Sequence, residues 1–184
     1  MQSALGNSIV QRAIGAARLD GPTYEEVEHD VNANTQALIV VGIAAIAAAI
    51  GGLTDGASGL ISALVSGLAG FAVASYFIYF VGTRLTPSAS TSATYGEVLR
   101  CLGFAYAPNV LLFLHVIPGV GGLLSFIIGI WAVVTMIIAT MHALEMSALR
   151  AVATSILASI IAAIIIAIIV GFIGGTAIGV GSLF

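Results

Sequence analysis

The chain has 184 residues, of which 60% are hydrophobic and 7% are charged, and its mean hydropathy is +1.16. A soluble domain carries about 25% charged residues, so this composition predicts a membrane protein and excludes an ordinary soluble domain. The net charge is -3, all five basic residues are arginines, and no basic run exists that would neutralise nucleic-acid phosphates. A single cysteine, Cys101, excludes an internal disulfide and a cysteine-rich metal site.

Residues 3–19 are predicted to form an amphipathic helix rather than a signal peptide, because apolar and polar residues segregate at helical spacing. Such a helix lies in the membrane interface with its two arginines, Arg12 and Arg18, toward lipid headgroups. The alternative is that it packs on the cytoplasmic end of the protein's own helix bundle. The two interpretations are compatible.

A short acidic helix is predicted next, over residues 24–30. Asp20–Pro22 breaks the chain before it, and Thr23 with Glu26 has the spacing of a capping box. Its carboxylates are interpreted as a solvated face in preference to a cation site. The sharper hypothesis is a docking surface for a basic partner, formed by Glu25, Glu26, Glu28 and Asp30.

Five apolar stretches are predicted to cross the membrane as helices: residues 36–50, 60–81, 100–118, 123–143 and 146–173. The predicted fold is therefore an all-α, polytopic membrane bundle, with a cytoplasmic segment at residues 1–34 and a five-helix domain at residues 35–184. With alternating spans, all five arginines fall on one side. The positive-inside rule then predicts a cytoplasmic N-terminus and an external C-terminus.

The third span contains Pro108 near its middle, and a proline there removes a backbone donor and kinks or opens a helix. Asn109 follows directly and is expected to satisfy a freed backbone group. With Tyr106 and His115, these residues mark a helix break that is predicted either to pack statically or to open a groove. His115 is interpreted as an interface or hydrogen-bonded core residue in preference to a proton relay.

The fifth span carries a small residue at every fourth position, and a shorter series occurs in the fourth span. Such ridges let helices approach closely in lipid. They are predicted to pack within one bundle or, alternatively, to form a homo-oligomer seam. The candidate packing residues are Gly121, Ser125, Gly129, Ser155, Ser159, Ala163, Ala167, Gly171, Gly175 and Gly179.

A cytoplasmic ion cluster is predicted from Arg100, His142, Glu145 and Arg150, because His142 and Glu145 share a helix face and Arg150 follows closely. One histidine and one carboxylate are too few ligands for a metal site. No nucleophile–base pair, carboxylate pair or phosphate loop is visible either. The sequence therefore predicts no enzyme, no cofactor and no metal.

Several motifs together resemble those of the Yip (Ypt-interacting protein) domain family. The resemblance extends from Arg12 to about Val170, and its most specific elements are Tyr-Ala-Pro and Ile-Trp. The segments that carry it are Leu19–Glu28, Tyr95–Pro108, Ile117–Gly119, Ile130–Trp131 and Ala148–Ala151.

The resemblance implies a five-helix integral membrane protein with a cytoplasmic N-terminus. Eukaryotic members are associated with Rab-type GTPases and with traffic between endoplasmic reticulum and Golgi, and they carry a longer cytosolic N-terminal region. This chain looks like the compact prokaryotic branch, which implies the bacterial or archaeal cytoplasmic membrane. GTPase binding is not assigned to any residue.

The sequence is compatible with two functions. The first is a non-catalytic membrane protein that organises, assembles or adapts other membrane proteins, with membrane lipids, a second copy or another membrane complex as partners. The second is lipid or small-solute transport through a groove at the Pro108–Asn109 break. Intramembrane charges, which ion-coupled transporters usually need, are nearly absent.

Overall fold

The computed structural model describes residues 8–89 and 91–181, with side chains up to Ile165, and every regular element in these ranges is helical. The elements are α1 (Ile9–Ala17), α2 (Gly21–His29), α3 (Ala33–Gly51), the 3₁₀ segment η1 (Gly52–Asp55), α4 (Gly56–Arg84), α5 (Tyr95–Ala105), the 3₁₀ segment η2 (Ala107–Val116), α6 (Gly121–Ala143) and α7 (Ala148–Gly181). The predicted all-helical fold is confirmed.

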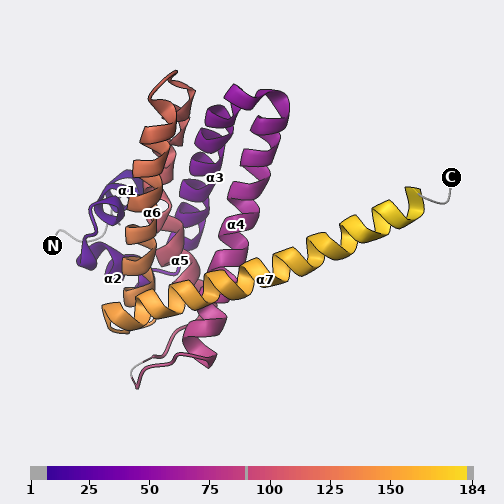
Figure 1. The fold of residues 1–184 in the computed structure, drawn as a ribbon. Helices are drawn as coiled ribbons and strands as arrows, with labels where there is room; N and C mark the ends of the chain where they lie inside the picture. The colour runs from indigo at the N-terminus through magenta and orange to yellow at the C-terminus, as the bar shows by residue number, and fades with distance from the viewer. Residues whose placement is uncertain (1–7, 90, 182–184) are drawn as a thin grey trace.

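Four stretches of the described chain are long and apolar enough to cross a membrane: residues 33–84, 95–116, 121–143 and 148–165. The first of them contains α3, η1 and α4, and Figure 1 shows that α3 and α4 run side by side in opposite directions. A helix of the length of α3 reaches about 28 Å, close to the thickness of a bilayer's hydrocarbon core. The protein is therefore membrane-embedded.

The turn between α3 and α4 depends on two glycines that touch across it. A Cβ atom on Gly52 would lie 2.6 Å from the carbonyl oxygen of Gly59, and a Cβ on Gly59 would collide with the Gly52 carbonyl. A similar approach joins α3 to α5, since a Cβ on Gly103 would lie 2.7 Å from the Cβ of Ala37. Missing side chains thus allow three helices to pack with their backbones close together.

The core surrounds α5, where it meets α2, α3, α4 and α6. Its largest fully buried side chains include Tyr24, Phe104, Ile78, Leu102 and Leu144. Helices α1 and α2 form a small unit on the flank of α6, next to α5, and Figure 1 shows them in indigo on the opposite side of the bundle from α4. The N-terminal segment is therefore part of the packed structure.

Helix α7 differs from the others in direction. Its first turns pack on α4 and α6, with Ala151, Thr154 and Ala158 buried. Figure 1 shows α7, in yellow, crossing the other long helices near one end of the bundle, with its C-terminal half running away from them. Helix α7 is therefore joined to the bundle through its N-terminal half.

Helix α2 begins earlier than predicted, and its capping differs. Its N-cap is Asp20, whose carboxylate accepts hydrogen bonds from the backbone N–H of Thr23 at 3.2 Å and from the Thr23 hydroxyl at 2.6 Å. The predicted capping box of Thr23 and Glu26 is wrong, because aspartate is an equally good N-cap and stands three residues earlier. Of the predicted 3–19 helix, residues 9–17 are helical and residues 3–7 lie outside the described chain.

Candidate functional site

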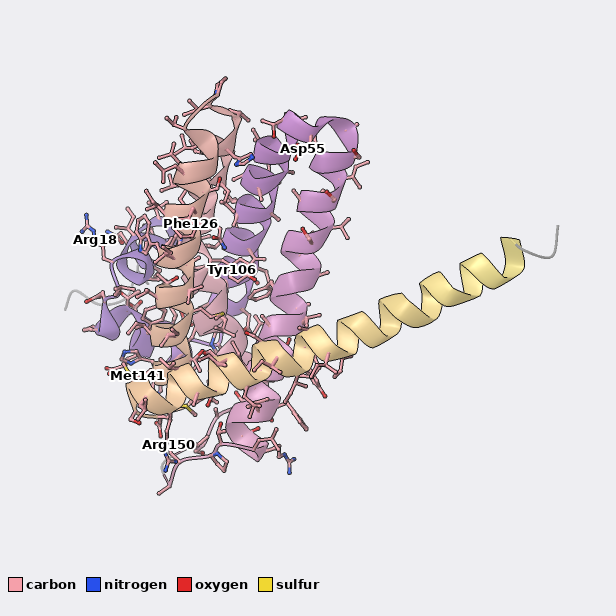
Figure 2. The ribbon with its side chains drawn as sticks, viewed as in Figure 1. Arg18, Asp55, Tyr106, Phe126, Met141 and Arg150 are labelled. Carbon is pink, nitrogen blue, oxygen red and sulfur yellow. The ribbon has the colours of Figure 1, made fainter. Side chains whose placement is uncertain are left out.

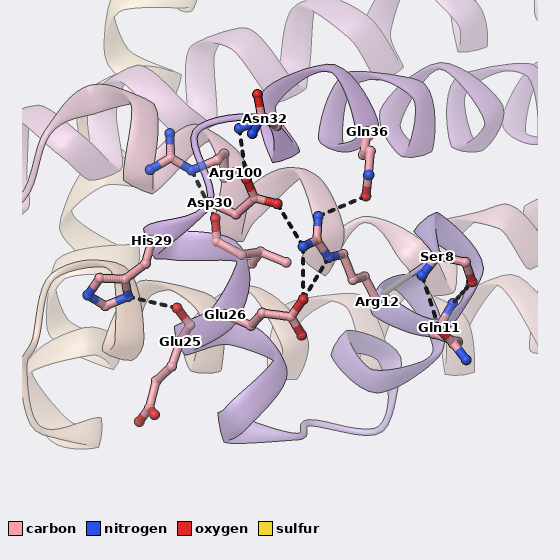
Figure 3. Close-up of polar contacts among 11 residues, drawn as sticks. Ser8, Gln11, Arg12, Glu25, Glu26, His29, Asp30, Asn32, Gln36 and Arg100 are labelled. Atoms are coloured by element: carbon pink, nitrogen blue, oxygen red, sulfur yellow. Dashed lines mark hydrogen bonds and ion pairs between the residues drawn. The ribbon is translucent and has the colours of Figure 1, made fainter. Parts of the chain in front are cut away.

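Arg12 holds α1, α2 and α3 together. Its side chain is only 2% exposed, and its guanidinium reaches Glu26 at 2.8 Å, Asp30 at 2.7 Å and the Gln36 side chain at 3.0 Å. Figure 3 shows these partners converging on it. The expectation that Arg12 faces lipid headgroups is wrong, because the carboxylates of Glu26 on α2 and of its C-cap Asp30 attract it into the protein.

Arg100 also contacts the C-terminal end of α2, from α5. Its side chain is also buried, and it donates hydrogen bonds to the carbonyl oxygens of Val27, at 2.9 Å, and of Glu28, and to the side chain of Asn34 at 3.3 Å. The last carbonyls of a helix have no partner within the helix and carry its negative dipole end. A cation from α5 therefore satisfies the C-terminus of α2.

Tyr24 anchors the middle of α2 in the bundle. It is fully buried, its hydroxyl donates to the Ala16 carbonyl at 3.0 Å, and its ring stacks on that of His142 with centroids 5.7 Å apart. Burial raises the pKa of the Tyr24 phenol well above its ordinary value, so the hydroxyl remains a donor. Trp131 of α6 adds a bond of 2.8 Å from its indole N–H to the Ala17 carbonyl.

The four predicted docking carboxylates have different environments. Glu26 and Asp30 bind Arg12, and this partner lowers the pKa of Asp30. Glu28 is 8% exposed, and burial raises its pKa to about 7. Glu25 is 67% exposed and lies 3.9 Å from the His142 ring nitrogen. Only one of the four carboxylates is thus presented fully to an external partner.

The four residues of the predicted ion cluster make separate contacts. Arg100 caps α2, and His142 lies between Tyr24 and Glu25. Glu145, with φ of 47°, stands in the turn between α6 and α7, and its carbonyl accepts a bond from Ser88 at 3.3 Å. Arg150 donates to the Pro87 carbonyl at 2.8 Å. The contacts tie α2, the loop after α4 and the start of α7 to the same end of the bundle.

The α-helical part of the third predicted span ends just before Pro108. α5 ends at Ala105, and the chain continues from Ala107 as the 3₁₀ segment η2, in which the Asn109 N–H bonds to the Tyr106 carbonyl at 2.9 Å. Because proline has no N–H, the Ala105 carbonyl loses its 3₁₀ partner. The hydroxyl of Thr135 on α6 supplies it at 2.8 Å, a role that the sequence had suggested for Asn109.

A cavity of about 400 Å³, here called the break groove, lies beside Pro108 between α1, α3, η2 and α6. Its walls are apolar throughout, apart from the edge of one indole ring. The lining residues are Ile9, Val10, Ala13, Ile14, Ala17, Ile39, Val40, Ile43, Ala107, Pro108, Val110, Leu111 and Trp131.

The other residues predicted at the break lie elsewhere. Tyr106 packs edge-on against Phe71 of α4, with ring centroids 5.1 Å apart. His115 bonds through Nδ1 to the Ser125 hydroxyl at 2.9 Å and lines a separate cavity of about 220 Å³ near the α3–α4 turn. The structure therefore brings Pro108 alone of the four to the break groove.

Some of the predicted packing residues make close contacts and others do not. A Cβ on Gly121 would collide with the His115 backbone, whereas a Cβ on Gly129 would meet nothing within 4 Å. On α7, Ser155 is buried, while Ser159 and Ala163 line a cavity of about 520 Å³ between α4, α6 and α7. Ala167, Gly171, Gly175 and Gly179 lie beyond the described side chains.

The contacts that hold α1, α2 and the helix break on the bundle were not predicted from the sequence. They are made by Arg12, Tyr24, Trp131 and Thr135. Glu26 and Asp30 share a helix face four residues apart, and that spacing was a signal for a basic partner such as Arg12. For Thr135, no local signal exists, because its partner lies 30 positions away in sequence. Within the described residues, no group of three or more His, Cys, Asp or Glu side chains is placed to hold a metal ion.

The comparisons with known proteins identify the family. The model of the Yip1 domain matches residues 22–179, from the start of α2 to the end of α7. No curated protein and no solved structure gives a significant match. The matched region covers most of the chain and contains α2, the helix break and all four candidate spans, and the protein therefore belongs to the Yip1 domain family.

Proposed function

We propose that this protein is a non-catalytic membrane protein that organises, assembles or adapts other membrane proteins, and that it does so through α7. The supporting observation is the shape of α7. A helix of 34 residues is about 51 Å long, well beyond the 30 Å or so of a hydrocarbon core. Its first half packs on α4 and α6, and its backbone then leaves the bundle (Figure 1), so the second half is available to a partner.

The sequence of the second half of α7 favours a helix as that partner. Ala167, Gly171, Gly175 and Gly179 recur every fourth residue, and such ridges let a second helix approach in lipid, where hydrophobicity provides no driving force. The partner is a second copy of the chain or a different membrane protein. The exposed Glu25 of α2, in the N-terminal segment, is also proposed as a contact for a basic partner.

The proposed topology has five spans, with α3 and α4 crossing separately and α7 crossing last. It places Arg12, Arg18, Arg84, Arg100 and Arg150 on the cytoplasmic side, with the N-terminus. For α7 to cross together with the others, it has to lie along them when embedded in the bilayer. A cytoplasmic membrane is the proposed location.

Replacing the small residues of this ridge with leucine tests the proposal. Ala167→Leu, Gly171→Leu and Gly175→Leu are combined, and the matched control combines Ile164→Leu, Ile168→Leu and Phe172→Leu on the neighbouring ridge. The mass of the complex extracted in mild detergent is then measured for each chain. We expect the ridge variant to lose its partner and the control to retain it. An unchanged mass in the ridge variant contradicts assembly through this ridge.

A second candidate function, lipid or small-solute movement, is favoured by the break groove, because discontinuous helices line substrate sites in transporters. Its test uses the chain reconstituted in vesicles with a labelled lipid. Replacing Pro108→Ala and Asn109→Leu restores the missing N–H and removes the polar side chain. Lipid movement that is as fast in this variant as in the parent protein rules out the break as the route.

A further inference from the structure

Helices α4 and α7 form a wedge that is narrow at the base of α7 and opens away from it. At the narrow end, Ile78 of α4 and Ala158 of α7 are both buried. Farther from this end, Gly70 of α4 and Ala163 of α7 are both exposed. Figure 1 shows the same divergence, because α7 crosses α4 and then runs away from it. Contact between the two helices is thus concentrated at the base of α7.

The space in this α4–α7 wedge is a cavity of about 520 Å³ with small residues on both walls. They are Ser66, Ala69, Gly70 and Ala74 on α4, and Ala158, Ser159, Ala162 and Ala163 on α7. A Cβ atom on Gly70 would meet nothing within 4 Å, so the α4 wall is open at that point. Two helices with such walls are able to approach until their backbones touch, which is how helices pack closely in lipid.

The contact at the base of α7 also leaves one hydrogen bond unformed. Ser155 lies four residues before Ser159 on the same ridge and is 4% exposed. Among the described residues, its hydroxyl is the one buried side-chain polar atom without a hydrogen-bond partner. A buried hydroxyl without a partner is unfavourable, and serine hydroxyls bond across pairs of membrane helices. A change in how α7 crosses its neighbours is therefore a change that this residue favours.

The composition of α7 favours hydrocarbon around it, while polar contacts hold its base. Residues 151–184 contain no charged residue, whereas a helix that lies in the plane of the headgroups has a charged face. The hydroxyls of Thr154 and Thr86 share a hydrogen bond of 2.7 Å, and Arg150 donates to the Pro87 carbonyl at 2.8 Å. Figure 2 shows Arg150 at the start of α7, beside the loop after α4. Rotation about this held base is the movement that brings the rest of α7 alongside α4.

We propose that α7 closes the α4–α7 wedge when the protein is embedded in a bilayer, by rotating about its base until its small residues lie along those of α4. The occupant of the cavity is then this chain's own α7. Its attachment favours it over a second molecule, because a tethered partner has an effective concentration in the millimolar range. The closed contact is also continuous with the one that the base of α7 already makes on α4.

Closure and assembly compete for the same surface. The ridge that closure places against α4 contains Ser159 and Ala163, and it continues along α7 as Ala167 and Gly171. When α7 lies on its own α4, a partner helix has to displace α4 to reach this ridge. The competition rests on the proposed assembly role, whereas the closure itself does not require a partner.

Cysteine cross-linking tests the closure. Because α7 starts beside the last turns of α4, the closed pair is antiparallel. If Gly70 meets Ala163, then Ser62 meets Gly171, eight residues farther along each helix. The double variant Ser62→Cys and Gly171→Cys is made in the Cys101→Ser chain, reconstituted in vesicles and treated with a short bismaleimide. We expect most molecules to be cross-linked within one chain.

The matched control pairs Gly171→Cys with Phe126→Cys, because Phe126 is 66% exposed on α6 and, like Ser62, lies near the start of its helix. We expect several-fold less cross-linking for this pair. Equal cross-linking of the two pairs, or none for Ser62, overturns the closure. Cross-linking of Ser62 to Gly171 of a second molecule overturns it as well, since α4 then receives α7 from another copy.

The substitution Gly70→Leu provides the second measurement, because the open and closed arrangements predict different results. In the open wedge leucine fits without strain, whereas in the closed wedge it holds the two backbones apart. We expect cross-linking between Ser62→Cys and Gly171→Cys to fall several-fold. Gly129→Leu is the control, because a Cβ there also meets nothing within 4 Å. Unchanged cross-linking in Gly70→Leu overturns the closure.

The mass of the extracted complex separates this inference from the assembly role. A cross-linked chain that is extracted without a partner supports the closure and contradicts assembly. A complex with a partner helix in which Ser62 and Gly171 do not cross-link, even after the partner is removed, overturns the closure and leaves assembly in place.

Discussion

Two buried arginines decide how the N-terminal segment is held. Arg12 reaches from α1 to the carboxylates of α2, and Arg100 reaches from α5 to the carbonyls that end α2. A buried cation is costly unless it is paired, and every guanidinium nitrogen of both arginines has a hydrogen-bond partner, on several elements. The segment before the first span is therefore attached through specific polar contacts in addition to the burial of Tyr24.

Replacing Arg100 with alanine should detach α2. The substitution leaves the buried carbonyls of Val27 and Glu28 without a donor, and a lost bond to a charged group costs about 1.5–3 kcal/mol. We expect the free energy of unfolding in detergent to fall by about 3 kcal/mol, and α2 to become sensitive to protease. Arg150→Ala, which loses one exposed bond to Pro87, is the control. Equal effects of the two substitutions would contradict a special role for Arg100.

Glu28 should make stability depend on pH. Burial raises its pKa from 4.5 to about 7, with Glu97 and Glu145 adding to the increase and His29 and Arg100 opposing it. The folded state therefore binds the proton more tightly than the unfolded state. The Glu28 contribution to stability is present in full below pH 4.5 and is lost as the pH rises to about 7.

The Glu28→Gln variant removes this dependence. Relative to the parent protein, it should gain stability as the pH rises from 4.5 to 7 and then show a constant difference. Thermal unfolding followed by circular dichroism at several pH values measures the difference. Glu25→Gln, at an exposed position on the same helix, is the control. A difference between Glu28→Gln and parent that does not change with pH would show that Glu28 is not the titrating group.

At the scale of elements, the helix break is the feature most directly readable from sequence. Pro108 predicts where the α-helix stops, because a missing N–H and a steric clash are local properties. The hydrogen-bond partner of the freed Ala105 carbonyl could not be predicted in the same way, because it is the hydroxyl of Thr135 on another helix. The same contrast applies to Glu26 and Asp30, whose spacing was visible but whose attraction of Arg12 into the protein was not inferred.

The ridge on α7 shows a further limit of sequence patterns. Ser155 of the predicted ridge is buried, but the next buried residues are Ala158 and Ala162, and Ser159 and Ala163 are exposed. A period of four residues drifts around a helix with 3.6 residues per turn, and the direction of crossing decides which residues make contact. Small residues predict that close packing is possible and do not fix the partner helix.

Thr135→Val tests the repair of the break. The substitution keeps the volume and removes the donor to the Ala105 carbonyl, leaving that oxygen buried and unpaired. We expect a loss of about 1–3 kcal/mol in unfolding free energy. Thr140→Val is a matched control, because Thr140 is equally buried on the same helix and bonds only within it, to the Met136 carbonyl. If Thr140→Val costs as much, the bond to Ala105 has no special value.

At the scale of the whole molecule, the composition predicts the membrane environment, and the family match extends over nearly all of the described helices. Neither of these predicts the direction of α7, which crosses the other long helices in Figure 1. Its direction depends on lipid and on partner helices, neither of which a pattern of residues specifies.

The five-span topology can be tested by cysteine labelling. In a Cys101→Ser chain, Ser58→Cys marks the α3–α4 turn and Ser92→Cys marks the loop before α5, and both positions are exposed. We expect a membrane-impermeant maleimide to reach them from opposite sides, with a C-terminal tag on the side of Ser58. A tag on the side of Ser92 would mean that α7 does not cross the membrane.

The most direct test of the central claim is the mass of the unaltered protein extracted from its own membrane in mild detergent, with every bound component identified. The account predicts a defined complex that contains additional helices, either from another membrane protein or from further copies of this chain. A bare monomer that carries only lipid would contradict the assembly role.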